Sequence, residues 1–165
     1  MLKPVIQNPS PVLHKKAEKV SDFKNQKLHK IIKDMKDTLN EQDGLGLAAP
    51  QIGISKAIFV IPPDYAPKVR TLSIPMSLFS PLRPIVYINP RITKYSDKKE
   101  EWEEGCLSIK GVYYKLTRNL NVTIEAQTEG GKTFSVNAEG LLAKLYQHEI
   151  DHLNGLLITD RLHKK

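Results

Sequence analysis

A five-residue segment near the end of the chain carries the side chains best suited to catalysis. It reads His148-Glu149-Ile150-Asp151-His152. On an α-helix, side chains four residues apart lie on the same face, so both imidazoles can bind one divalent metal ion. Glu149 then lies close enough to accept a proton from a water molecule. This spacing is typical of metal-dependent hydrolases, and it predicts a metal site on a helix.

Two histidines are too few for a catalytic metal, which usually has three protein ligands. Proteases with the same motif take the third ligand from downstream, yet here Ile158 stands in the position of that histidine and no glutamate follows Glu149. The ligand must therefore come from upstream, where Cys106 is the only thiol. A Cys plus two His set leaves one tetrahedral position open for water. Gly105, next to Cys106, allows the backbone to turn tightly at this point.

Apolar periodicity predicts a helix on each side of a strand-rich region. An amphipathic helix is expected over residues 25–41, with its apolar positions at Leu28, Ile31, Ile32, Met35 and Leu39. A second helix, which carries the two histidines, is expected from about Glu139 after a cap at Asn137 and should end at Asn154-Gly155.

Strands are expected between these helices, at residues 57–61, 85–88, 112–116, 120–126 and 132–136. The second of them should end at Asn89-Pro90, and the last two should form a hairpin. The stretch from Pro62 to Pro84 contains six prolines and is expected to be a long surface loop or flap. It either covers an apolar site or packs on the body as a small satellite cluster. Together the elements predict an α+β fold with a mainly antiparallel sheet.

The composition is that of an ordinary globular protein. With 165 residues, 40% hydrophobic and 26% charged, the chain is expected to form a single domain over residues 1–165. No apolar run reaches the roughly 20 residues that span a bilayer, and Met1 to Val5 lack a signal-peptide core, so we expect a cytoplasmic protein without membrane contact. The net charge of +7 would suit an anionic neighbour such as RNA, but the scattered lysines favour a solvated surface, and no specific DNA binding is expected.

Two further segments accompany the histidine motif. Residues 44–51 follow the pattern Gly-x-Gly-x-Ala-Ala-x-Gln, residues 104–108 read Glu-Gly-Cys-Leu-Ser, and residues 147–152 read Gln-His-Glu-Ile-Asp-His. In these three segments, their order and their approximate spacing, the chain resembles the peptide deformylases over its whole length. The resemblance implies an α+β fold in which antiparallel β-sheets pack around a central C-terminal helix carrying the two histidines, with an N-terminal amphipathic helix.

The resemblance also implies a reaction, the removal of the formyl group from the N-terminal formylmethionine of newly synthesised polypeptides with release of formate. A metal ion on Cys106, His148 and His152 would lower the pKa of its water and present hydroxide to the formyl carbon. Glu149 would act as general base and then as general acid toward the departing amine.

Substrate contacts follow from the same resemblance. It assigns stabilisation of the oxyanion to the side-chain amide of Gln51 and the backbone N–H of Leu107. Backbone groups near Gly46 would bind the main chain of the substrate as an added strand. The apolar pocket for the methionine side chain is expected from Leu45, Leu141 and Leu145.

The ligand types alone do not identify the metal, because a site of one Cys and two His suits Zn, Fe(II), Co or Ni. The resemblance favours Fe(II) in vivo, with Zn or Ni often found after purification. It also implies nascent N-formylmethionyl peptides as partners, and the basic charge adds the ribosome surface as a further candidate.

The chain departs from the family pattern at two rim positions. Lys110 stands where the family commonly has proline, and Tyr113 stands where many members have arginine, so contacts to the peptide beyond methionine are expected to differ. Arg118 matches a position that pairs with Glu104 and would support the cysteine segment.

Two other functions are compatible with the residues. A zincin-like protease would cleave internal peptide bonds, although its downstream ligand is missing. A basic RNA- or ribosome-binding protein would hold a structural metal in a closed site, and the fourth ligand would then come from His14, His29 or His163.

Overall fold

The computed structural model describes residues 1–65 and 85–162, and its architecture confirms the expected α+β class. The helices are α1 (Gln26–Asn40), α2 (Gly140–Leu153) and the short α3 (Ile158–Leu162). The strands are β1 (Leu47–Ala48), β2 (Ile58–Ile61), β3 (Ile85–Tyr95), β4 (Lys99–Cys106), β5 (Ile109–Asn119), β6 (Asn121–Gln127) and β7 (Thr133–Glu139).

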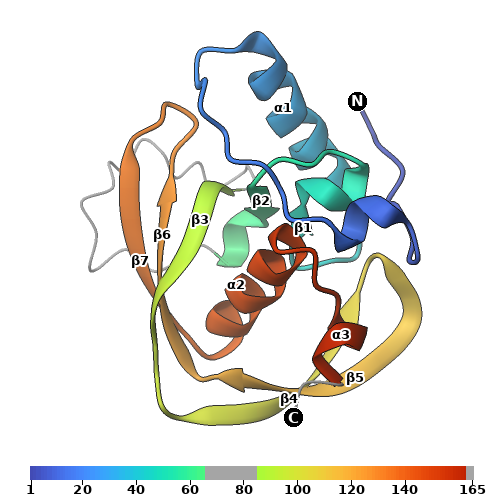
Figure 1. Ribbon diagram of the computed structural model, residues 1–165, viewed down its shortest axis with the longest axis vertical. Helices are drawn as coiled ribbons and strands as arrows, with labels where there is room; N and C mark the ends of the chain where they lie inside the picture. The colour runs from blue at the N-terminus through green and yellow to red at the C-terminus, as the bar shows by residue number, and fades with distance from the viewer. Residues whose placement is uncertain (66–84, 163–165) are drawn as a thin grey trace.

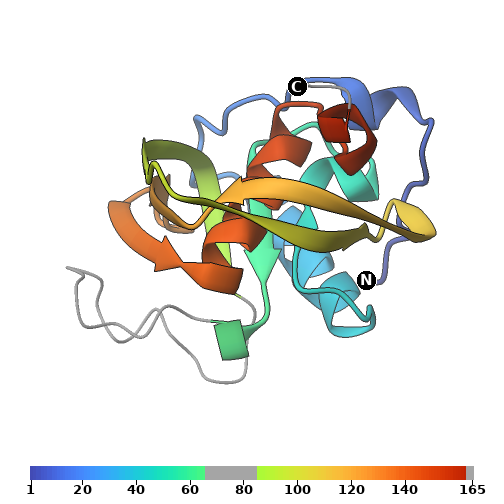
Figure 2. The same cartoon turned by 90° about the horizontal axis from the view of Figure 1, so that it is seen from below.

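All strand pairs are antiparallel, and they form two sheets. Five strands lie in the order β1-β2-β3-β6-β7, and β4 pairs with β5 in a separate hairpin. Helix α2 lies in the middle of the molecule, with the larger sheet on one side and α1 beyond β2 (Figure 1). The hairpin β4-β5 crosses α2 on the side seen in Figure 2. The helix with the two histidines is therefore enclosed by strands.

Strand β2 divides the apolar core into two parts. Successive side chains of a strand point to opposite faces of the sheet, and all four residues of β2 are buried. Phe59 and Ile61 pack into the cluster that includes the α2 side chains, whereas Ile58 and Val60 pack into the cluster beneath α1. A strand covered on both faces explains why this segment is apolar without alternation.

Helix α1 confirms the amphipathic helix expected near the N-terminus. Its buried apolar side chains are Leu28, Ile32, Met35 and Leu39, and Ile31 is half-buried against the same cluster. The helix begins after Asn25, whose side chain accepts a hydrogen bond from the backbone N–H of Lys27 at 2.9 Å. This satisfies one of the free N–H groups at the helix start.

Several boundaries expected from the sequence are wrong. Strand β5 runs over Ile109–Asn119 and not only over residues 112–116. Strand β3 does not end at Asn89-Pro90 but continues to Tyr95, because a register shift between Ile88 and Arg91 places the proline in an irregular part of the strand. Asn137 does not cap α2. It lies within β7, and the chain turns from strand into helix at Gly140, whose φ of 59° suits glycine.

Strand β4 was not expected, because the sequence Lys99–Cys106 is mostly charged. The segment Pro62 to Pro84, expected to be a surface loop, lies outside the described residues from 66 onward, and its first residues form a short 3-10 helix, Pro63–Tyr65. Among the helices of the described ranges, none has the length and apolar character needed to cross a membrane.

A pair of buried tyrosines joins α2 to the larger sheet. The hydroxyls of Tyr87 on β3 and Tyr146 on α2 lie 2.5 Å apart, and both residues are at most 1% exposed. Within the described residues, each hydroxyl has the other as its hydrogen-bond partner. The pair thus satisfies two polar atoms in an otherwise apolar core.

We predict that Tyr146→Phe lowers the free energy of unfolding by about 1–3 kcal/mol, because the hydroxyl of Tyr87 then stays buried without a partner. Tyr87→Phe should have a similar effect, and the double variant should cost less than the sum of the two. Urea unfolding of the four proteins measures this coupling. Strictly additive losses would show that the two hydroxyls do not depend on each other.

Candidate active site

Three potential metal ligands converge between β4 and α2. The Sγ atom of Cys106, at the end of β4, lies 3.3 Å from Nε2 of His152, and that nitrogen lies 3.2 Å from Nε2 of His148. The three donor atoms all lie within 4.8 Å of one another. Of the histidines proposed as a fourth ligand, neither His14 nor His29 belongs to this group, and His163 lies outside the described residues.

The donor set fits a divalent metal ion. A tetrahedral ion with the usual bond lengths to nitrogen and sulfur holds such donors roughly 3.3–3.6 Å apart. The separations of 3.3 and 3.2 Å in two of the three pairs here are close to this range. The two Nε2 atoms face each other, an arrangement that requires either a shared proton or a cation between them. Nδ1 of His152 is buried and, within the described residues, has no hydrogen-bond partner.

The pKa shifts of the two histidines also favour a positive charge between their rings. Burial lowers the pKa of His148, but hydrogen bonds with Cys106 and Glu104 outweigh it and raise this pKa to about 10. Burial and the neighbouring charge of His148 hold the pKa of His152 well below its ordinary value. The pair thus stabilises one positive charge at this point, and a metal ion would take the place of that proton.

A largely buried carboxylate, that of Glu104, fixes the orientation of His148. Oε2 of Glu104 lies 3.2 Å from Nδ1 of His148, which leaves Nε2 of the same ring directed toward the other donors. Arg118 donates to both oxygens of Glu104, at 2.8 and 2.9 Å, as the family resemblance implied. Burial raises the pKa of Glu104, but the hydrogen bonds from Arg118 and His148 lower it to about 2, so the group is a carboxylate at neutral pH.

Two residues that sequence reasoning gave no role complete this network. Nη1 of Arg118 donates to Oδ2 of Asp151 at 2.6 Å, and Nε of Arg161 on α3 donates to the same oxygen at 2.9 Å. Asp151 is 5% exposed. The clue that the sequence offered was an acid inside the histidine motif, one residue before a proposed ligand. Arg161 offered no such clue, because its partner is known only from the fold.

Glu149 lies beside the potential metal ligands and is enclosed by the glycine loop. It is 2% exposed, and its Oε2 atom has no hydrogen-bond partner among the described residues. The backbone of Gly46 approaches so closely that any side chain there would collide with the Glu149 carboxylate. Burial raises the pKa of Glu149 to about 7, with the charge of His148 acting in the opposite direction. A carboxyl group with this pKa can both accept and release a proton near neutral pH.

Gln51 presents its amide N–H group to the same centre. Its Oε1 atom accepts a hydrogen bond from the backbone N–H of Ala48 at 2.8 Å, which fixes the orientation of the amide. Nε2 then lies 3.3 Å from Oγ of Ser108 and 3.8 Å from Sγ of Cys106. Ser108 is fully buried, and its role in holding Gln51 was not recognised from the sequence. Leu107 lies in the two-residue turn between β4 and β5, with its side chain against Gly44.

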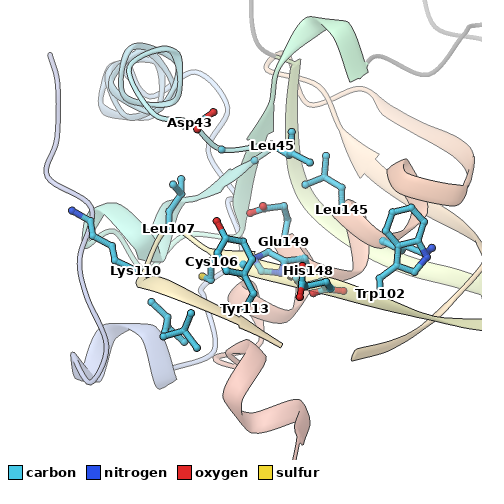
Figure 3. A pocket seen from close by; sticks show the side chains of 18 of the residues that line it. Asp43, Leu45, Trp102, Cys106, Leu107, Lys110, Tyr113, Leu145, His148 and Glu149 are labelled. Carbon is cyan, nitrogen blue, oxygen red and sulfur yellow. Dashed lines mark hydrogen bonds and ion pairs between the residues drawn. The ribbon is translucent and has the colours of Figure 1, made fainter. Parts of the chain in front are cut away.

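A pocket of about 430 Å³ opens over these residues. Of the residues expected at the site, all except the buried His152 line it, including Leu45, Gly46, Leu141 and Leu145. Figure 3 shows Leu45 and Leu145 on one side of Glu149 and His148, and Leu107 and Lys110 on the other. Tyr113 lies at the rim, 67% exposed, with its ring against Gly105. One part of the pocket is thus apolar, and two of the three potential metal ligands, Cys106 and His148, line it.

The chain matches the family model described as polypeptide deformylase over residues 2–165. A peptide deformylase from Acidobacterium capsulatum is 40% identical over 162 residues, which cover 98% of this chain and 87% of the relative. The crystal structure of the peptide deformylase from Thermotoga maritima has a TM-score of 0.82 and 34% identity, and the match covers 98% of this chain and 97% of that one. A peptide deformylase from Legionella pneumophila gives a TM-score of 0.83 and 38% identity, with 99% and 88% covered. Because the match in sequence and in fold extends over nearly the whole chain, the chain belongs to the polypeptide deformylase family.

Proposed function

We propose that this protein removes the formyl group from the N-terminal formylmethionine of newly synthesised polypeptides and releases formate. The observation that carries the proposal is the convergence of Cys106, His148 and His152 beside Glu149, at the base of a partly apolar pocket. Membership of the polypeptide deformylase family, whose relatives bear the name of this activity, supports it.

Cys106, His148 and His152 would hold one divalent ion, and we propose Fe(II) in the cell, with Zn, Ni or Co able to occupy the same donors. When bound, the ion would act as a Lewis acid and lower the pKa of water toward neutrality. Glu104 supports this role by keeping the ring of His148 in place.

Glu149 moves the proton. Its carboxylate accepts a proton from the attacking water and later gives it to the amine that leaves the formyl carbon. Its pKa of about 7 suits both steps, and its position against Gly46 keeps it within the pocket without making it a ligand.

The negative charge that develops on the formyl oxygen needs hydrogen-bond donors. We assign these to Nε2 of Gln51, whose orientation Ala48 fixes, and to the backbone N–H of Leu107. The main chain of the substrate would lie along the backbone near Gly46, and its methionine side chain would enter the space lined by Leu45, Leu141 and Leu145.

The position of the third metal donor, Cys106, also distinguishes this proposal from its two alternatives. A zincin-like protease would take that donor from downstream of the helix, whereas here it comes from β4, upstream of α2. A structural metal would need a fourth protein ligand, and the group within the described residues has three. We further propose a single domain over residues 1–165, a cytoplasmic location and nascent peptides at the ribosome surface as the setting of the reaction.

Replacing the proposed general base should separate metal binding from catalysis. We predict that Glu149→Ala keeps about one metal ion per chain but releases formate from a formyl-Met peptide at least about 100-fold more slowly. Elemental analysis and a formate assay on the same preparation measure both quantities. Glu101→Ala, on the exposed side of β4, is the matched control and should behave like the unmodified protein. Full activity of Glu149→Ala would exclude the proposed role.

The role of Gln51 as a donor to the oxyanion can be tested by removing its side-chain amide. Gln51→Ala should lower kcat by about 100- to 1000-fold, because the donor acts on charge that is present only in the transition state. Ser108→Ala removes the hydrogen bond that helps to hold this amide, and it should cause a smaller loss in kcat. Steady-state kinetics with metal content measured in parallel tests this order. A kcat that survives Gln51→Ala would contradict the assignment.

The identity of the bound metal can be determined on protein that is purified without oxygen. Protein purified anaerobically should contain Fe(II), and removing the metal with a chelator should abolish formate release, which Fe(II), Ni or Co then restores. Cys106→Ala should fail to retain the ion, because two imidazoles alone bind it weakly. The iron form should also lose activity in air faster than the nickel form, since an iron-bound thiolate is prone to oxidation. Anaerobic protein that is active without any bound metal would overturn the site.

A further inference from the structure

The apolar part of the pocket ends at a tryptophan held by an ion pair. We propose that Trp102, kept in place by Lys144 and Glu100, is the end wall of the methionine pocket and limits the length of the first side chain of the substrate. This inference rests on the proposed function, and it adds specificity-determining residues to the same site.

Three side chains make the contact. Nε1 of Trp102 donates to Oε2 of Glu100 at 2.7 Å, and Nζ of Lys144 lies 2.7 Å from the same oxygen. The same Nζ atom lies 3.0 Å from the centroid of the indole ring. Lys144 therefore touches the face of the ring while Glu100 holds its edge, and both torsion angles of the tryptophan are restricted.

The contact repeats the spacing that builds the metal site. Glu100, Trp102 and Glu104 are alternate residues of β4 and lie on one face of the strand. Lys144 and His148 are four residues apart on α2 and lie on one face of the helix. Four residues of helix and two of strand both advance roughly 6–7 Å. The contact of Lys144 with Trp102 thus lies one step away from the contact of His148 with Glu104.

Burial of the Lys144 ammonium group lowers the stability of the folded protein unless the group is paired. Its side chain is 3% exposed, although it carries an ammonium group that loses hydration in such a place. An apolar residue would fill the same position of the helix without this penalty. The ammonium group instead pairs with Glu100 and covers the face of Trp102, so its effect is to fix the position of the indole.

The pocket places this wall where a methionine side chain would end. Trp102, Lys144, Leu45, Leu141 and Leu145 all line it, and Leu45 and Leu141 are each 39% exposed. In Figure 3, Leu145 lies between Glu149 and Trp102. Asp43 and Lys110 also line the pocket, and Figure 3 shows them on the other side of Glu149 from Trp102, where they suit the polar backbone of the following residues. A thioether that reaches the indole also makes a favourable contact of sulfur with the ring.

The test compares formyl-Met, formyl-norleucine and formyl-ethionine in otherwise identical tripeptides, since ethionine is one methylene longer than methionine. In the metal-loaded wild-type protein, kcat/KM for the ethionine peptide should be lower by about tenfold or more. Trp102→Leu should remove most of this difference. Lys144→Met should do so too, although this residue acts only by positioning the indole, whereas Lys144→Arg keeps a cation over the ring and should preserve it.

The matched control is Lys115→Met on β5, an exposed lysine outside the pocket, which should leave the ratio between the two peptides unchanged. A ratio between two substrates of one preparation does not depend on the fraction of folded protein. A merely structural role for Lys144 would therefore lower both rates together and leave the ratio as in the wild type, and that result would overturn the inference.

A second readout does not depend on catalysis. Trp102 is the single tryptophan of the chain, so intrinsic fluorescence reports on this wall alone. Titration of the wild-type protein with the product peptide Met-Ala-Ser should change its emission, and Lys144→Met should alter both the starting emission and the response. Formate release from formyl-Met combined with unchanged emission and unchanged selectivity would reject the wall and leave the deformylase intact. Absence of formate release from all three peptides would reject the proposed function itself.

Discussion

The geometry of the site depends on the largely buried carboxylate of Glu104. It receives two hydrogen bonds from Arg118 and lies against Nδ1 of His148, so one group connects β4, β5 and α2. A buried charge of this kind is tolerated only when its oxygens have partners, and removing one partner leaves the others uncompensated. Arg118 is itself 4% exposed and needs both Glu104 and Asp151. The proposed metal ligands are thus held by charges that stabilise one another.

The strands and helices of the fold serve this arrangement. The hairpin β4-β5 brings its charged inner face to α2, and the larger sheet supports the opposite side of the helix with apolar contacts. The glycine loop then closes over Glu149, where the backbone of Gly46 leaves no space for a side chain. Apolar packing therefore positions the helix, whereas ion pairs orient the side chains that it presents.

Local patterns in the sequence predicted the parts of the structure that depend on local spacing. The helical period identified α1 and the face of α2 with its two histidines, and counting ligands led to Cys106. The errors arose where contacts between distant segments of the chain determine the local structure. Pro90 stays within β3 because the partner strand accommodates an irregularity, and β4 was missed because its charged residues find their partners on α2. Lys144 and Arg161 appear in the sequence as two more basic residues, and only the fold shows what they contact.

The turn between β4 and β5 contains only Leu107 and Ser108, directly after Cys106. In the proposed mechanism these consecutive residues supply a thiolate, a backbone N–H and the hydroxyl that holds Gln51. Three tasks that many enzymes distribute over separate loops are encoded here in one uninterrupted tripeptide. Insertions are tolerated in most surface turns, but a single added residue in this one would displace all three groups together. Evolutionary change in this protein is therefore expected to adjust the walls of the pocket while the length of this turn stays constant.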